Sequence, residues 1–165
     1  MQMRHALLPI LVGMSAMSSI AEAAPRNQVV GTWRMVAAEI ERDGKVVPAY
    51  GQRPSRMLIF APDMHYVEVL TDGDLPRFAS NLRGQGTDEE NRTAMATSIG
   101  MFGSYTVDEN GDFGGDRVEG STFPNWVGSV RTQKDIRIVV NGDQMTNYFT
   151  RPDGTKITII FERAK

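Results

Sequence analysis

Short β-like runs separated by turn signals recur along most of this 165-residue chain. The runs are rich in β-branched and aromatic residues, and glycine, proline, asparagine or aspartate follows nearly every one of them. About eight strands are expected, at residues 31–40, 56–60, 65–71, 104–108, 113–122, 126–140 (one bent strand or two), 144–150 and 155–163. Regular spacing of this kind favours an antiparallel barrel or sandwich over alternating strand–helix units. We therefore predict a mainly β fold.

One helix is expected within the β pattern, at about residues 88–102. Thr87 and Glu90 have the spacing of a capping box, in which each side chain accepts a hydrogen bond from the other residue's backbone N–H. The apolar positions form one stripe at helical spacing: Met95, Ile99 and Phe102. Gly103 follows at a place where a left-handed residue would end the helix.

The N-terminal segment is typical of a secretory signal peptide. A short positive region precedes an apolar run at residues 6–17, and Ala21-Glu22-Ala23 has the small-x-small pattern that a signal peptidase cuts. An N-terminal membrane anchor is the alternative, but the run is short for a bilayer span. We predict a signal peptide at 1–23, a barrel domain at 24–165 without an integral membrane segment, and export to the periplasm or medium.

Composition removes several classes of function. With 18 Lys and Arg against 20 Asp and Glu, the chain lacks the basic excess of a nucleic-acid-binding protein. It has no cysteine, so disulfides, thiolate metal sites and cysteine nucleophiles are excluded. His65 is the one imidazole of the expected mature chain, and a structural or surface role is favoured over a haem-binding or catalytic one. No metal and no cofactor are expected.

The two ends of the expected domain carry matching signals for a barrel. Gly31-Thr32-Trp33 lies on the first strand and Phe161-Glu162-Arg163 lies on the last one. The pair resembles the lipocalin pattern, which implies that Trp33 fills the barrel floor and that Arg163 packs over its indole. Such a cation–π contact contributes about 0.5–2 kcal/mol. The alternative is that Trp33 is an ordinary core residue of another β fold.

A broader resemblance runs through nearly all of the expected mature chain. The segments that carry it are Val30–Trp33, Gly44–Pro48, Tyr50-Gly51, Leu58–Phe60, Arg77-Phe78, Phe102–Val107, Val118–Ser121, Phe123–Gly128 and Arg131. They are similar to the bacterial and fungal lipocalin-like domain proteins. This resemblance implies an eight-stranded barrel with an inserted helix, and no settled catalytic mechanism. The family often has histidines just before the Val118–Ser121 segment, where this chain has Asp116-Arg117, so imidazole chemistry is not expected there.

The strand at Arg117–Ser121 is the first place to look for a polar site. Alternation places Arg117, Glu119 and Ser121 on one face and Val118 on the other. If the polar face points inward, its charges are buried partners that mark a site; if it points outward, they are ordinary surface charges. The candidate ligand-binding residues are Arg117, Glu119, Tyr105, Trp126, Arg131 and Asn147.

We predict that the barrel binds a small hydrophobic or amphipathic molecule, because barrels of this size enclose space for one ligand. One alternative is a cofactor-free isomerase or cyclase, with Glu119 and Tyr105 as weak acid–base candidates. Another is a solid barrel that acts on a protein partner through its surface. The scarcity of catalytic groups favours binding, and the sequence does not indicate the oligomeric state.

Overall fold

A computed structural model describes residues 26–42, 44–50, 53–151 and 153–165 of the chain. The expected signal peptide at residues 1–23 lies outside the described residues. The strands are β1 (Gly31–Arg42), β2 (Lys45–Pro48), β3 (Pro54–Phe60), β4 (His65–Asp72), β5 (Ile99–Val107), β6 (Phe113–Ser121), β7 (Val130–Thr132), β8 (Ile136–Asn141), β9 (Gln144–Thr150) and β10 (Lys156–Arg163). The helical segments are α1 (Asp88–Ala96) and the single 3-10 turn η1 (Pro124–Trp126).

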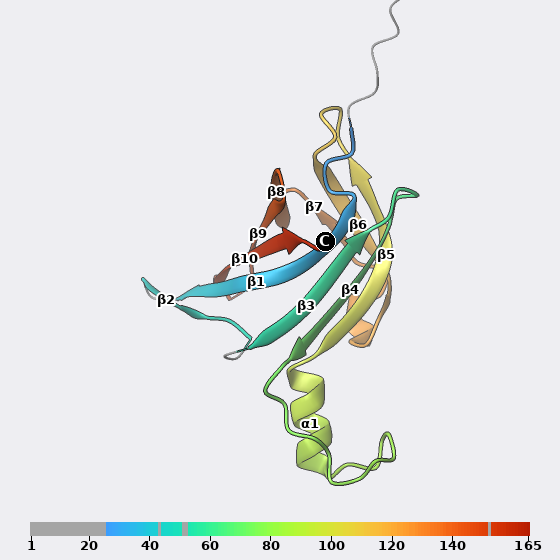
Figure 1. Ribbon diagram of the computed structural model, residues 1–165, viewed down its shortest axis with the longest axis vertical. Coiled ribbons are helices and arrows are strands. Elements are labelled where there is room, and N and C mark those ends of the chain that lie inside the picture. Colours follow the sequence, from blue (N-terminus) through green and yellow to red (C-terminus); the bar gives the residue numbers. More distant parts are fainter. Residues whose placement is uncertain (1–25, 43, 51–52, 152) are drawn as a thin grey trace, which may run out of the picture.

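The strands form one antiparallel sheet that curls into a nearly closed barrel (Figure 1). Neighbours follow the order β7-β6-β5-β4-β3-β1-β10-β9-β8, and β2 pairs separately with β1. The predicted mainly β barrel with one α-helix is therefore confirmed. The sheet has 10 strands instead of about eight, because β2 was expected to be a turn and loop. The segment at residues 126–140 forms two strands, β7 and β8, which settles the alternative of one bent strand.

Alternate side chains of each strand point into the barrel and form its core. On β4, the burial pattern alternates strictly between exposed and buried from His65 to Leu70. The core is rich in aromatic and aliphatic groups, and its most deeply buried members are Trp33, Phe113, Phe161, Met145, Ile157, Ile159, Val29 and Val118. The barrel interior is thus filled mainly by side chains, and inward position on a strand decides which residues share it.

Trp33 closes one end of the barrel. Its indole is completely buried, and its Nε1 donates a hydrogen bond of 2.7 Å to the carbonyl of Val29. The guanidinium of Arg163 lies over the ring, with Cζ 4.1 Å from the ring centroid, and Nη1 donates to the carbonyl of Val30 at 2.7 Å. Gly31 is required beside this stack, because a Cβ there would lie 2.3 Å from Nη1 of Arg163. The contact that the sequence pattern predicted between Trp33 and Arg163 is present.

The helix is shorter than predicted. The capping box of Thr87 and Glu90 is present, but α1 ends at Ala96, and the expected stretch 97–102 is not helical. The residues that follow the helix enter β5, in which Ile99 pairs with Leu70 of β4. Sheet pairing overrides the helical spacing here, and α1 itself buries no residue and lies beyond one end of the barrel (Figure 1).

Gly103 has a different role from the predicted helix end. It lies within β5, beside a register shift against β6, and a Cβ on it would lie 1.9 Å from the carbonyl oxygen of Arg117. Only glycine allows the two backbones to approach this closely.

From the contacts at the closed end we predict that Arg163→Met loses more stability than an equivalent substitution on the outer face. The variant loses the cation–π contact and the bond to Val30, so its free energy of unfolding in urea should fall by about 1–3 kcal/mol. Arg137→Met is the matched control, because Arg137 lies 5.4 Å from the centroid of the Tyr148 ring on the exposed outer face. The control should change by less than about 0.5 kcal/mol. Equal losses in the two variants would contradict a special role for the closed end.

Candidate functional site

Two ion pairs lie inside the barrel, one fully buried and the other partly exposed at Arg131. Arg56 of β3 pairs with Glu68 of β4, and their side chains are only 7% and 5% exposed. Asp116 of β6 holds Arg131 of β7 through two bonds, 2.8 Å from Nε to Oδ1 and 2.5 Å from Nη2 to Oδ2. Burying charges is unfavourable unless they are paired and hydrogen-bonded, so two such pairs in one small barrel need an explanation.

The strand periodicity places these charges inside. Glu68 lies between Tyr66 and Leu70, and all three are buried on the inward face of β4. On β6, Asp116 and Val118 are buried. Arg131 is the direct cross-strand partner of Asp116 in the ladder between β6 and β7, which explains the fork-to-fork geometry of that pair.

Three buried side-chain atoms lack a hydrogen-bond partner among the described residues. They are Nε of Arg56, the hydroxyl of Tyr66 and Oδ1 of Asn147. The Tyr66 hydroxyl lies in the field of Asp116, Arg131 and Glu68, so it belongs with the ion pairs electrostatically. A buried polar atom without a partner costs about 1–3 kcal/mol, and folded proteins contain few of them.

Five of these residues are linked by ion pairs or by close charges, and we call them the interior polar cluster: Arg56, Tyr66, Glu68, Asp116 and Arg131. Asn147 is a further buried polar residue, on the inward face of β9. Their charges cancel formally, with two guanidinium groups against two carboxylates. Burial raises the pKa of Tyr66 far above its ordinary value, so its hydroxyl keeps its proton. Burial also raises the pKa of Asp116, and the Arg131 guanidinium opposes this shift.

Arg131 and Asn147 were predicted as ligand-binding residues. Arg131 belongs to this cluster, and Asn147 is buried on the inward face of β9. Arg117 and Glu119 are instead exposed on the outer face of β6, because Asp116 and Val118 occupy its inward positions. The alternative in which Arg117 and Glu119 are buried partners inside the barrel is therefore wrong.

The other predicted site residues lie elsewhere. Tyr105 is buried near the closed end, where its hydroxyl donates to the Ala61 carbonyl at 2.7 Å and accepts from Asn27 at 2.9 Å. Trp126 is exposed on η1, with its ring edge-on to Phe123 at 5.5 Å between centroids. The side chain of His65 is exposed, with Nδ1 3.3 Å from Oδ1 of Asp63, as expected of a surface histidine.

Four members of the cluster were not predicted from the sequence: Arg56, Tyr66, Glu68 and Asp116. A signal for Glu68 was present, because a carboxylate in phase with Tyr66 and Leu70 must share their burial. Asp116 is buried and faces the interior of the barrel.

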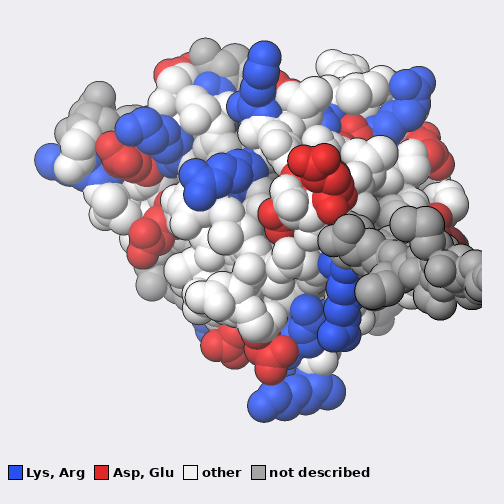
Figure 2. All heavy atoms as spheres, turned by 90° about the horizontal axis from the view of Figure 1, so that it is seen from above, with Lys and Arg blue, Asp and Glu red and all other residues white. Residues whose placement is uncertain are grey.

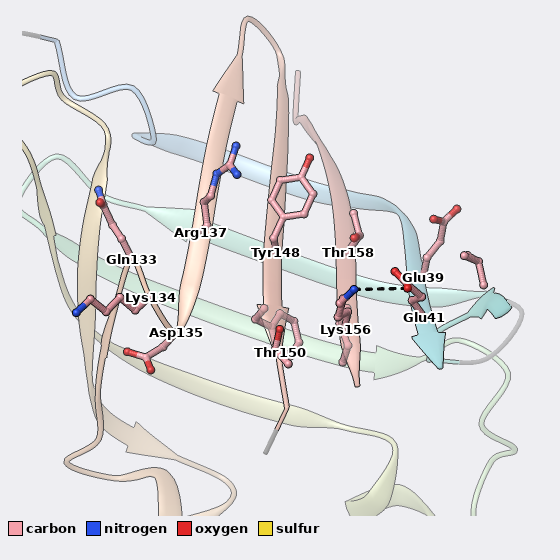
Figure 3. A pocket seen from close by; sticks show the side chains of 13 residues that line it. Glu39, Glu41, Gln133, Lys134, Asp135, Arg137, Tyr148, Thr150, Lys156 and Thr158 are labelled. Atoms are coloured by element: carbon pink, nitrogen blue, oxygen red, sulfur yellow. Dashed lines mark ion pairs between the residues drawn. The ribbon is translucent and has the colours of Figure 1, made fainter. Parts of the chain in front are cut away.

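A surface groove with a volume of about 490 Å³ lies on the outer face of β8, β9, β10 and β1 (Figure 3). Arg137 and Tyr148 stack there, and Lys156 pairs with Glu41 at 3.5 Å. Charges of both signs line it, and Figure 2 shows acidic and basic groups interspersed at the end of the molecule seen from above. We find no polar atom in the groove with the buried, unpartnered character of the interior cluster.

Within the described part of the chain, no group of three or more acidic or histidine side chains could hold a metal ion. No helix in the same part is long and apolar enough to cross a membrane.

The family model of the lipocalin-like domain matches the chain over residues 30–155. The chain belongs to this lipocalin-like domain family. The match includes β1 to β9 and every member of the interior polar cluster. Comparison with curated proteins and with solved structures gave no significant match. Family membership establishes the fold of this lipocalin-like domain, and its function has to be argued from its own residues.

The Arg56–Glu68 pair predicts a strongly non-additive mutant cycle. Glu68→Gln leaves Arg56 buried without a counter-charge, so the free energy of unfolding should fall by about 3–5 kcal/mol. The double variant Arg56→Met, Glu68→Leu removes both charges and should recover most of that loss. Arg56→Met should also lose stability, because it leaves Glu68 buried without a counter-charge. Urea denaturation measures the two single variants and the double variant.

Glu89→Gln is the surface control for this cycle. Glu89 pairs with Arg92 at 2.7 Å on the exposed face of α1, so the change should be below about 1 kcal/mol. Additive losses at Arg56 and Glu68 would show that the two charges are not coupled.

Proposed function

We propose that this lipocalin-like domain binds a small amphipathic molecule inside the barrel, with the polar group of the ligand at the interior polar cluster. The observation that carries the proposal is the set of three unpartnered buried atoms, on Arg56, Tyr66 and Asn147. A structure optimised for stability alone would pair or replace them. A ligand that supplies the missing hydrogen bonds recovers their desolvation cost when it binds.

The unpartnered atoms define the chemistry of the ligand. Nε of Arg56 can only donate, Oδ1 of Asn147 accepts, and the Tyr66 hydroxyl can do both. The two ion pairs already neutralise each other, so an anionic ligand would add an uncompensated charge to the interior. The cluster therefore favours a neutral group with a donor and an acceptor, such as a hydroxyl or a carboxamide.

The apolar part of the ligand would lie among the core side chains. Met101 and Met145 are buried there, and methionine adapts its shape more readily than branched residues do. The end opposite Trp33 is the natural route of access, because Ile40, Tyr50 and Phe149 pack on the core there and are only partly buried. The unpartnered atoms are enclosed by protein, so binding requires these side chains to shift.

The isomerase or cyclase alternative loses its proposed acid–base pair. Glu119 lies on the outside of β6, whereas Tyr105 is buried at the closed end and already hydrogen-bonded. Binding is therefore the better-supported function. We also propose, from the N-terminal sequence alone, that the domain acts after export.

The proposal predicts opposite effects on stability and on binding in Asn147→Leu. Leucine removes the unpartnered amide oxygen, so the free energy of unfolding of the empty protein should rise by about 1 kcal/mol. Binding of the neutral fluorophore N-phenyl-1-naphthylamine should weaken at the same time, as measured by fluorescence titration. Thr146→Val, on the adjacent outward position of β9, is the control and should leave binding unchanged.

Ligand class is tested by displacement of the same fluorophore. Dodecan-1-ol should displace it from the wild-type protein at about tenfold lower concentration than dodecanoate at neutral pH, because of the cost of burying the carboxylate. No fluorophore binding to the wild type, or unchanged binding to a destabilised Asn147→Leu variant, would overturn the proposed function. Stronger displacement by dodecanoate would overturn only the preference for a neutral group.

A further inference from the structure

The groove on the outer face of β8, β9, β10 and β1 is a second place where a small molecule can lie (Figure 3). Its floor is the outward face of these four strands. Residues 133–135 line it beyond β8, and Val46 of β2 lines it beyond β1. Its volume of about 490 Å³ lies within the ordinary range for small-ligand sites. Because a folded partner protein needs a much larger contact surface, the groove suits a short, extended ligand.

One row of outward side chains crosses the floor from a cation to an anion. Its members are successive cross-strand partners on β8, β9, β10 and β1: Arg137, Tyr148, Thr158 and Glu39. Arg137 and Glu39 are exposed, and neither has an ion-pair partner among the described residues. Three strand spacings separate the two ends of the row, so their Cα atoms are about 14 Å apart.

The other charges that line the groove preserve this polarity. Nζ of Lys156 pairs with Oε1 of Glu41 at 3.5 Å, so these two charges offset each other near Glu39. Beyond β8, the Asp135 carboxylate accepts hydrogen bonds from the backbone N–H and the hydroxyl of Thr132, and Lys134 precedes it. Two cations against one carboxylate leave the β8 end positive, and two carboxylates against one ammonium leave the β10–β1 end negative.

The middle of the groove presents an aromatic ring and hydroxyl groups. Tyr148 is 42% exposed, and Thr158 and Thr150 lie beside it on the floor. The next outward row toward the closed end consists of uncharged residues, Val139, Thr146 and Ile160. Hydroxyl groups donate and accept hydrogen bonds, and a tyrosine ring adds an apolar surface, so this region matches a chain of amide groups.

We propose that the groove binds a short peptide with free termini in extended conformation, with the peptide carboxylate at Arg137 and its ammonium group at Glu39. Four extended residues span about 13 to 14 Å, which matches the separation of the two ends. A guanidinium holds a carboxylate through two parallel hydrogen bonds. The groove shares no residue with the interior polar cluster, so this inference is independent of the proposed ligand function.

Titration of the ¹⁵N-labelled protein with tetra-alanine, followed by NMR, tests the proposal. The backbone amide signals of β8, β9 and β10 should shift in a saturable way, and those of β3 and β4 should not. Tetra-alanine with an acetylated amino end and an amidated carboxyl end should bind about tenfold more weakly, because both charges are lost. Added salt should weaken binding of the free peptide more than binding of the blocked one. No saturable shift, or equal affinity for the two peptides, would overturn the proposal.

Two substitutions test the orientation of the peptide. Arg137→Met and Glu39→Gln should each weaken binding of tetra-alanine by about two- to fivefold. Arg137→Met should also no longer distinguish the free from the amidated carboxyl end, and Glu39→Gln should no longer distinguish the free from the acetylated amino end. Loss of discrimination at the opposite end would contradict the orientation.

Glu162→Gln is the matched control, because Glu162 is an exposed glutamate on β10 outside the groove. It should bind tetra-alanine like the wild type, and an equal loss in this variant would show that the effect is not local to the groove. Maltotetraose is the neutral comparison ligand of similar length. Saturable shifts of the same signals with maltotetraose and none with tetra-alanine would make the groove a sugar site and the peptide proposal wrong.

Discussion

The stack of Arg163 on Trp33 joins the two edges of the chain's β pattern and closes the barrel floor. It couples β1 to β10 through a buried indole, a cation–π contact and a bond to the Val30 carbonyl. Closing one end removes water from the interior, and this low-dielectric space makes every polar group inside expensive. Because the end is closed, the paired charges and the unpartnered atoms inside the barrel carry a large desolvation cost.

Strand β4 has a charged residue on its inward face and apolar residues on its outward face. Its inward face contains a carboxylate, Glu68, whereas its outward face presents Val67 and Val69 to solvent. A single antiparallel strand with one core face and one water face would show the reverse distribution. Each side of the strand also has groups without partners: buried polar atoms that lack hydrogen bonds on the inward side, and apolar side chains that lack packing contacts on the outward side. The unpartnered atoms of the inward side are why we connect the interior with a ligand.

The sequence predicted the features that depend on local rules. Turn residues and alternation predicted the barrel, the capping box predicted where α1 begins, and the terminal motifs predicted the contact at Trp33. Features that depend on pairing between distant segments were missed. The end of α1 is set by the pairing of Ile99 with Leu70. The sequence of β6 could not show which of its faces points inward, because its glycines leave Val118 as the main apolar residue that marks the buried side. Arg56 became a site residue only when the fold placed it against Glu68.

The order of the strands along the chain has a kinetic consequence. Arg163 bonds to Val30 across a separation of 133 residues, so β1 waits for its long-range partner until β10 has been synthesised. Folds dominated by such distant pairings fold slowly, because loop-closure entropy must be overcome before the contacts form. Until then the indole of Trp33 lacks its guanidinium cover, and this end of the barrel cannot close.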